Sequence, residues 1–205
     1  MKVLPCLVAL AGVIGATRLD AQAPLAAPTV GDGALLVATP AMTDPNFARS
    51  VVLVLRRDDN GTLGVVLNRV TSLRPIDVFP ELSPALAAYP GTLFRGGPAG
   101  AARVLFLVTG LAAAVVQGPE ILEDLFLSGD FEQLPEIASL AEGPMGLRVF
   151  AGHAEWTPGQ LEREIAAGSW QVTTGSVDLV FAEPAAIWER ATALTGGVVA
   201  AVRKP

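Results

Sequence analysis

WTPGQLE, residues 156–162, is the stretch that decides the fold of this chain, because it matches the start of an α-helix residue by residue. Thr157 suits the N-cap. Gln160 then falls at N3, where its side chain can bond the N-cap backbone N–H while the threonine hydroxyl accepts from the N3 amide. Pro158 falls at N1, where its fixed φ suits the first turn and no N–H is needed. The stretch therefore predicts a capping box.

The residues around this capping box extend the helix prediction. Trp156 precedes the cap and can pack on Leu161 in the first turn. Gly168 can supply the left-handed residue that follows the end of a helix. We therefore predict a helix over 158–167, with Trp156 buried against it. This structural reading explains the stretch without a ligand, but it leaves the carboxylates of Glu155 and Glu162 unexplained.

The N-terminal residues resemble an export signal. A lysine precedes a nearly continuous apolar run over 3–16, and a small-x-small site ends at Ala23. We predict a signal peptide over 1–23 that is removed, with cleavage after Ala21 as the alternative, followed by a linker over 24–30. An uncleaved membrane anchor is the competing reading, but the apolar run is shorter than the roughly 17 to 25 residues that a spanning helix needs. The expected location is periplasmic or secreted.

Composition restricts the function classes of the remaining chain. The formal net charge of the whole sequence is −6 and the sequence has no basic run, so we expect no nucleic-acid partner. No later apolar run has spanning length, and we expect no membrane span in the mature chain. The only cysteine, Cys6, lies in the predicted signal peptide, and His153 is the only histidine. Because zinc prefers nitrogen and sulfur ligands, we expect no metal, and we expect no cofactor.

The rest of the chain predicts one α+β domain over 31–205. Ser50 to Arg57 and Leu63 to Asn68 predict a β-hairpin, because the turn residues 59–61 (Asp-Asn-Gly) accept left-handed conformations. Further strands are expected over 33–39, 104–108, 112–116, 121–127, 146–151 and 176–181, with 104–108 paired to 112–116. The strand excess and the hairpin links favour a mostly antiparallel sheet.

Helices are expected mainly late in the chain. Residues 131–141 suit a helix capped by Asp130, with Gln133 at N3. Residues 69–90 contain four prolines and predict a loop, with at most a short helical turn over 82–88. The final helix is expected to begin near Pro184 and to end before Gly196, with the side chains of Ile187, Trp188, Ala191 and Leu194 buried.

Several segments together resemble the YqgE/AlgH family, also called DUF179 or UPF0301. They are Gly33 to Ala38, the residues Pro40, Met42, Asp44, Pro45 and Phe47, Ser50 to Leu53, Gly64 to Arg69, Gly96 to Pro98, Trp156 to Glu162 with Trp170, and Phe181 to Trp188. The resemblance implies a strongly bent sheet that closes toward a pseudo-barrel, and it supplies no catalytic residues. This chain departs from the family pattern at Val70, usually proline, and in its Gly-His-Ala-Glu-Trp run at 152–156, where relatives usually have Gly-Tyr-Ala-Gly-Trp.

His153 and Glu155 are the weak catalytic candidates. Two residues apart in a strand, they would project from the same face and could form a histidine–carboxylate pair. No serine lies in a Gly-x-Ser-x-Gly elbow, so hydrolysis through the usual triad has no support. The competing reading is a partly buried structural histidine.

A second group of residues suggests an anion or ligand site. Arg95, Gly96 and Gly97 could present a guanidinium and backbone amides to an anion, although a tight turn also explains the two glycines. Asn68 and Arg69 end a buried strand and could face the same groove.

Two functions are therefore open. The first is an exported, non-catalytic binding or regulatory domain with an unknown protein or small-molecule partner. The second is a small hydrolase or ligand-modifying enzyme that uses His153 and Glu155 near the Gly96-Gly97 turn. Convergence of these residues on one pocket would favour the enzyme, and their distribution over separate surfaces would favour the binding domain.

Overall fold

The computed structural model describes residues 30–82, 86–87 and 89–196. The predicted signal peptide, and the predicted linker up to residue 29, lie outside the described residues. Across the described ranges, no helix combines the length and the apolar character that crossing a membrane requires.

A single curled sheet organises the molecule. In the described residues its strands are β1 (Ala34–Ala38), β2 (Val51–Asp58), β3 (Gly61–Val66), β4 (Leu93–Arg95), β5 (Ala99–Thr109), β6 (Glu120–Leu122), β7 (Leu125–Ser128), β8 (Leu147–Trp156) and β9 (Trp170–Thr174). Their order is β6-β7-β5-β8-β3-β2-β1-β9, and β4 lies beside β8. The β4–β8 pair is parallel, whereas the other strand pairs are antiparallel. The predicted α+β class and the strongly bent, half-closed sheet are confirmed.

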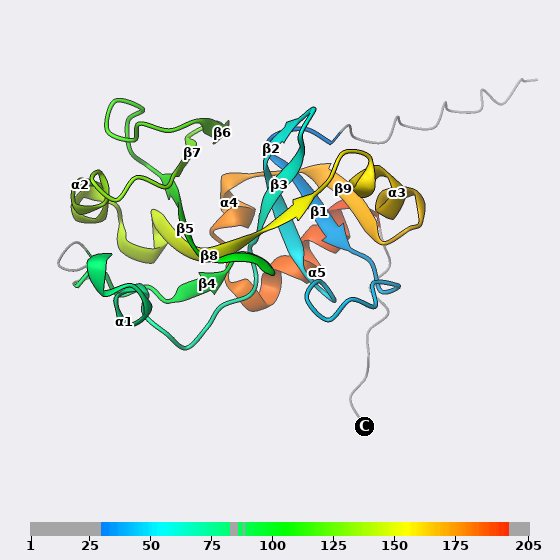
Figure 1. Cartoon of the computed structure of the whole chain (residues 1–205), viewed down its shortest axis with the longest axis horizontal. Coiled ribbons are helices and arrows are strands. Elements are labelled where there is room, and N and C mark those ends of the chain that lie inside the picture. Colours follow the sequence, from blue (N-terminus) through cyan, green and yellow to red (C-terminus); the bar gives the residue numbers. More distant parts are fainter. Residues whose placement is uncertain (1–29, 83–85, 88, 197–205) are drawn as a thin grey trace, which may run out of the picture.

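Short helices flank the sheet. They are α1 (Pro75–Val78), η1 (Pro80–Leu82), α2 (Leu134–Leu140), η2 (Gly143–Met145), α3 (Gln160–Ala166), α4 (Val177–Val180) and α5 (Pro184–Leu194). Figure 1 shows α1 and α2 at the β5–β7 end of the molecule, and α3 and α5 at the β1–β9 end. Buried side chains form one cluster around β5 and α2, one around β1, β9 and α3, and a third that includes α4 and α5.

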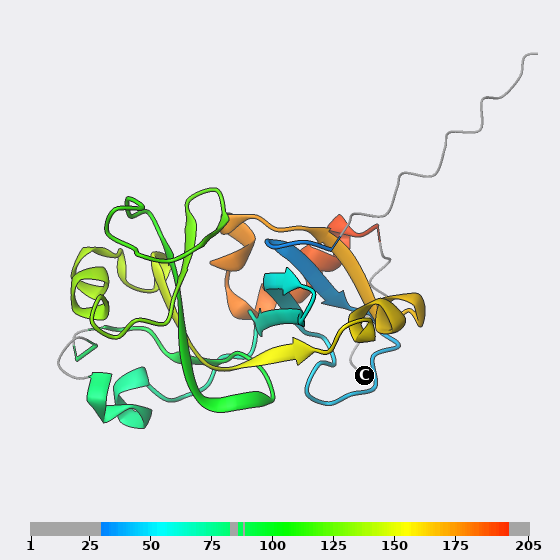
Figure 2. The same cartoon turned by 45° about the horizontal axis from the view of Figure 1, so that its top comes forward.

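Strand β8 connects the two ends. Its first half pairs with β5 and β4, and Gly64 of β3 pairs with Ala154 in its second half. Figure 1 shows β8 crossing the middle of the molecule, and the turned view in Figure 2 shows it running toward α3, with β1 and β9 side by side beyond it. Residues carried by β8 can therefore contribute to surfaces at both ends.

The predicted hairpin is confirmed. Asp58 pairs with Gly61 across a two-residue turn, and the backbone N–H of Asn60 donates to Asp58 Oδ1 over 2.8 Å. Gly61 adopts a positive φ of 130°, which glycine tolerates more readily than other residues. The local turn signal was sufficient here because both strands are adjacent in the sequence.

The helix predicted over 158–167 forms, but it begins later. Gly159 has φ = 76° and ends the turn that follows β8, so α3 begins at Gln160. Half of the capping box is present, because the Thr157 N–H donates to Gln160 Oε1 over 3.1 Å. The Thr157 hydroxyl donates to the same oxygen instead of accepting from an amide. Trp156 and Leu161 are buried in one cluster, as predicted.

The end of α3 follows the prediction closely. Gly168 has φ = 79°, its N–H donates to Ile165 O, and the Ser169 N–H donates to Glu164 O. These two bonds form a Schellman motif, in which a left-handed glycine allows the last carbonyl groups of the helix to be satisfied.

Two strand predictions are wrong. Residues 112–116 form turns, and β5 pairs with β7 and β8 instead. Residues 177–180 form the helix α4, because the Ser176 side chain accepts from the Leu179 N–H and caps it. An apolar run of this length fits a strand or a buried helix equally well, and only the cap distinguishes them.

Other boundaries shift. The segment 121–127 is extended, as predicted, but it contains two strands, with Asp124 in a left-handed turn at φ = 61°. The helix predicted over 131–141 begins at Leu134, because Gln133 is its N-cap while Asp130 bonds residues before it. In the loop 69–90, helical turns form at α1 and η1, and part of the turn predicted over 82–88 lies outside the described residues. In α5 the predicted core residues are buried, but Leu194 is 62% exposed.

Candidate functional site

Two neighbouring pockets lie on either side of Pro98, which contributes to both. We call the first the basic pocket. It has a volume of about 360 Å³ and is lined by Pro45, Asn46, Val66, Arg69, Val70, Thr71, Ser72, Arg95, Gly97 and Pro98. We call the second, of about 530 Å³, the acidic pocket, because Asp44, Glu155 and Glu164 are its charged lining residues.

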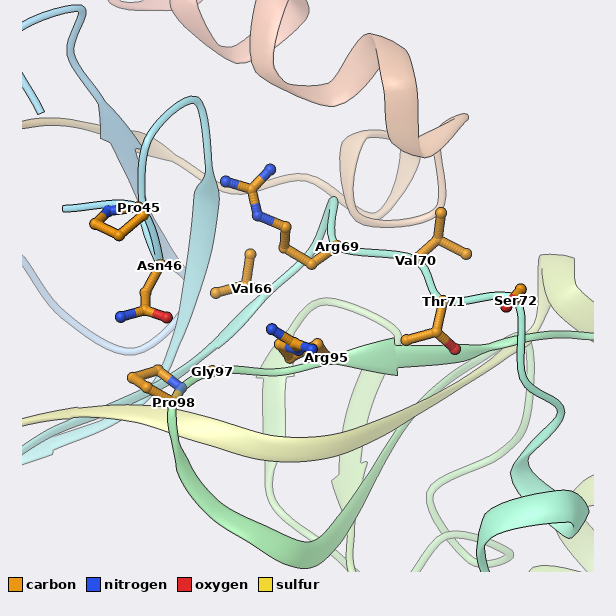
Figure 3. Close-up of a pocket in the computed structure, with 10 residues that line it drawn as sticks. All are labelled: Pro45, Asn46, Val66, Arg69, Val70, Thr71, Ser72, Arg95, Gly97 and Pro98. Carbon is orange, nitrogen blue, oxygen red and sulfur yellow. The ribbon is translucent and has the colours of Figure 1, made fainter. Parts of the chain in front are cut away.

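The basic pocket is built from three segments of the chain. Figure 3 shows Asn46 and Pro98 on one side and Thr71 and Ser72 on the other, with Arg69 and Arg95 between them. Arg95 ends β4, which is held in place by its parallel pairing with β8. The lining contains two arginines and no carboxylate, although the whole chain has a net charge of −6.

Asn68 and Arg69 shape the pocket wall through the loop that precedes β2. The Asn68 amide donates to Arg49 O over 2.8 Å, and its oxygen accepts from the Val51 N–H over 3.0 Å. Arg49 has φ = 55°, a conformation that few side-chain-bearing residues adopt, so the two amide bonds stabilise a strained backbone. Arg69 donates to Ala48 O in the same loop. Asn68 thus positions the wall and is not a lining residue.

Four arginines of the described residues form ion pairs, whereas others, including the two of the basic pocket, do not. The arginines that form ion pairs with carboxylates are Arg49, Arg56, Arg57 and Arg74. Within the described residues, Arg69 and Arg95 form no ion pair. Their positive charges are therefore not neutralised by neighbouring side chains.

The two glycines of the Arg95-Gly96-Gly97 turn have structural roles. The Gly96 N–H donates to Ala151 O and the Gly96 carbonyl accepts from the Val66 N–H, each over 2.8 Å. Its amide is therefore occupied within the fold, and Gly96 is not among the residues that line the basic pocket. A Cβ atom on Gly97 would collide with the carbonyl group of His153. Gly97 is required by this close approach of two backbones, and it also lines the basic pocket.

The acidic pocket contains a carboxylate that the sequence analysis missed. Glu164 Oε2 accepts from the indole N–H of Trp156 over 3.0 Å and from that of Trp170 over 2.8 Å. Its other oxygen accepts from Gln160 Nε2 over 3.0 Å. The two buried indoles are the sequence signal that could have indicated such an acceptor, because a buried indole N–H usually finds a partner. The Phe47 ring stacks on Trp156 and meets Trp170 edge to face.

His153 and Glu155 lie near each other, but they share no pocket. The imidazole Nε2 and Glu155 Oε2 are 3.4 Å apart. His153 is only 6% exposed and packs against Gly100, where a Cβ would lie 2.6 Å from its Cε1 atom. The Glu155 side chain is 67% exposed and lines the acidic pocket. His153 Nδ1 has no hydrogen-bond partner among the described residues.

The predicted site residues are thus divided. Arg69, Arg95 and Gly97 meet in the basic pocket, and Glu155 lies across Pro98 in the acidic pocket. In the part of the chain that the structure describes, no group of three or more histidine, cysteine, aspartate or glutamate side chains is placed to hold a metal ion.

Comparison with known proteins identifies the family to which this sheet and its pockets belong. The family model described as DUF179, AlgH-like, matches residues 35–200. The chain belongs to the AlgH-like family. The resemblance detected in the sequence is therefore confirmed.

The relatives of this AlgH-like chain include UPF0301 proteins of two Streptomyces species. It is 41% identical over 169 residues to a UPF0301 protein of Streptomyces avermitilis, which covers 76% of this chain and 82% of the relative. It is 44% identical over 150 residues to a UPF0301 protein of Streptomyces coelicolor, with 68% and 73% covered.

Two solved structures share the AlgH-like fold. A crystal structure of a Corynebacterium diphtheriae protein has a TM-score of 0.70 at 32% identity, and the match covers 82% of this chain and 88% of that protein. The solution structure of the AlgH protein from Pseudomonas aeruginosa has a TM-score of 0.67 at 27% identity, with 88% and 98% covered.

Proposed function

We propose that this AlgH-like chain is an exported, non-catalytic binding domain that takes an anionic ligand in the basic pocket. The observation that carries the proposal is the pair Arg69 and Arg95, which lines one cavity of about 360 Å³ with no carboxylate in the lining. Guanidinium groups bind phosphate and carboxylate oxygens through geometrically matched hydrogen bonds. A site with two such groups favours an anion over a neutral ligand.

The distribution of the other candidates supports binding over catalysis. A general acid or base must come within hydrogen-bond reach of its substrate. His153 is buried beneath Gly100, and it lines neither the basic nor the acidic pocket. Glu155 faces the acidic pocket, on the other side of Pro98 from the two arginines.

Export is the second part of the proposal. Its support is the sequence of residues 1–23, which combines a positive start, an apolar run and a small-x-small site. A ligand of the basic pocket would then be met outside the cytoplasm.

Calorimetric titration with inorganic phosphate tests the basic pocket. Arg95→Gln removes an exposed guanidinium that has no ion-pair partner among the described residues, so we expect folding to be unchanged and phosphate affinity to fall roughly tenfold. Arg103→Gln is the matched control, because Arg103 is also exposed and lies outside both pockets. Its affinity should stay within about twofold of the parent value.

Two results would overturn the ligand proposal. One is the absence of saturable phosphate binding by the full chain at low ionic strength, where surface electrostatic attraction is strongest. The other is an equal loss of affinity in the Arg95→Gln and Arg103→Gln variants, which would assign binding to net charge and not to the pocket.

A further inference from the structure

A third and larger cavity, of about 780 Å³, opens between β4, β8 and the segment from α4 to α5. Most of its wall is apolar or aromatic and includes Tyr89, Phe94, Phe181 and Met145. Its size falls in the range of small-molecule sites, which are mostly apolar clefts with a few well-placed polar groups. Arg148 is the polar group that distinguishes this cavity, and we call it the Arg148 cavity.

Arg148 is a buried cation whose hydrogen-bonding capacity is largely unused. It lies on β8 and is only 5% exposed. Its Nη2 donates to Ala182 O over 2.5 Å, and its Nη1 has no hydrogen-bond partner among the described residues. Across those same residues it forms no ion pair. A guanidinium carries five N–H donors, so most of its donor capacity is unused.

Aromatic rings hold this guanidinium in position. Its central carbon lies 4.8 Å from the ring centroid of Phe94 and 5.4 Å from that of Phe181. Cation–π contact compensates part of the cost of removing the charge from water, but the rings cannot accept the remaining hydrogen bonds in good geometry. An apolar residue would fill the same space without an unpaired donor, so packing alone does not explain an arginine here.

The Arg148 guanidinium keeps its positive charge at physiological pH. Burial lowers the pKa of Arg148 to about 10, while Tyr89 and Glu183 nearby favour the charged form. At neutral pH the guanidinium therefore remains protonated and can bind an anion.

The geometry points to a binding site for a small organic carboxylate with an apolar body, whose carboxylate bonds Arg148 and whose apolar part packs on Phe181 and Met145. Arginine and carboxylate form matched, charge-assisted hydrogen bonds, which are strongest where water is excluded. The inference does not depend on the anion proposed for the basic pocket.

The lining also indicates which carboxylates fit. Val70 and Met145 are 50% and 66% exposed, so the wall reaches solvent as apolar surface. Asp178 and Glu183 also line the cavity, together with Arg190. Two additional negative charges disfavour polyanions, because like charges repel strongly where screening is weak. A monoanion is therefore favoured over a phosphate ester or a dicarboxylate.

Methionine methyl NMR can locate binding without a mutation. The chain has three methionines, of which Met145 lines the Arg148 cavity and Met42 lines the acidic pocket. With ¹³C-methyl methionine in the full chain, decanoate is the probe and decanol its neutral match. We expect a saturable shift of the Met145 methyl signal with decanoate and no shift of Met42. Decanol should bind roughly tenfold more weakly, because it lacks the charge-assisted bond.

A charge-removing variant tests the role of the guanidinium. Arg148→Met keeps an unbranched side chain of similar length, and calorimetry should give a decanoate affinity reduced roughly tenfold, to the level of decanol. Should this variant not fold, Met145→Asp provides the same test from an exposed position. It removes an apolar contact for both ligands and places a negative charge in the cavity wall, so decanoate should be weakened more than decanol.

Three outcomes would overturn the inference. They are equal affinity for decanoate and decanol, a shift of Met42 with Met145 unmoved, and the absence of any saturable shift. Phosphate binding at Arg95 is measured separately and can fail without affecting these results.

Discussion

Trp156 and Trp170 donate their indole N–H groups to the same oxygen atom, Oε2 of Glu164. Their ring centroids are 6.0 Å apart and the planes meet at 81°, so the two indoles reach the carboxylate from different directions. One tryptophan ends β8 and the other begins β9. A single side chain of α3 therefore ties the ends of two strands that are not neighbours in the sheet.

Glu164→Ala should reduce the free energy of unfolding by about 2 kcal/mol, because two buried indole donors lose their acceptor. Urea unfolding followed by tryptophan fluorescence measures the change. Glu132→Ala serves as the control, since Glu132 is exposed, and its effect should stay within about 0.5 kcal/mol. Equal midpoints for the two variants would contradict the role assigned to Glu164.

Gly97→Ala should destabilise the fold by about 2–3 kcal/mol, because the new Cβ would collide with the His153 carbonyl and push β8 away from the turn after β4. Gly31→Ala is the matched control, since a Cβ there would meet nothing within 4 Å. Thermal unfolding by circular dichroism compares the pair. A Gly97→Ala melting temperature equal to that of the parent would show that the backbones can separate without cost.

Tyr89 is the only tyrosine, so its ionisation can be read directly from tyrosinate absorbance. Its hydroxyl donates to Leu147 O over 2.5 Å, and burial raises its pKa, although the charge of Arg148 acts in the opposite direction. We expect little tyrosinate in the native protein at pH 10, where an unfolded tyrosine is half ionised. Appearance of tyrosinate should coincide with unfolding.

The sign of the Tyr89 effect on stability follows from proton linkage. Above pH 10 the unfolded state loses the phenol proton while the native state keeps it, so the contribution of Tyr89 is lost as pH rises. Arg148 acts in the opposite sense above about pH 10, because its lowered pKa makes the native state release that proton before the unfolded state does. A native protein that shows half-formed tyrosinate at pH 10 would place Tyr89 in water instead.

Cleavage after Ala23 should leave 182 residues (205 − 23) beginning at Pro24. Intact-mass measurement of a tagged protein expressed in a Gram-negative host and recovered from the periplasm tests this. A mass that corresponds to a start at Gln22 would support the alternative cleavage site. Recovery of the uncleaved chain in the cytoplasm alone would contradict export.

Local patterns predicted the parts of the fold that local interactions determine. The hairpin formed because Asp59, Asn60 and Gly61 suit its turn, and the end of α3 formed because Gly168 accepts a left-handed conformation. The strand predicted at 112–116 failed because β5 pairs with β7 and β8, which were expected as strands but not as its partners. Pairing over such separations depends on the whole sheet and leaves no local signal.

The candidate site was predicted only in part. The sequence indicated Arg69, Arg95 and Gly97 as an anion site, and the fold brings them to one pocket. It did not distinguish Asn68, which holds the neighbouring loop, because residue type does not reveal hydrogen-bond partners. Arg148 was missed inside a predicted strand, although a charge within an otherwise buried run is a signal for a special environment.

Strand β8 couples the unfolding of the two ends of the sheet, because its first half pairs with β5 and its second half pairs with β3. Neither end retains a full set of neighbours without it, so heating should melt the protein in one cooperative step. Any compound that occupies a cavity at either end will then raise the melting temperature of the entire chain. A thermal-shift screen can thus survey every pocket at once, before the identity of any natural ligand is known.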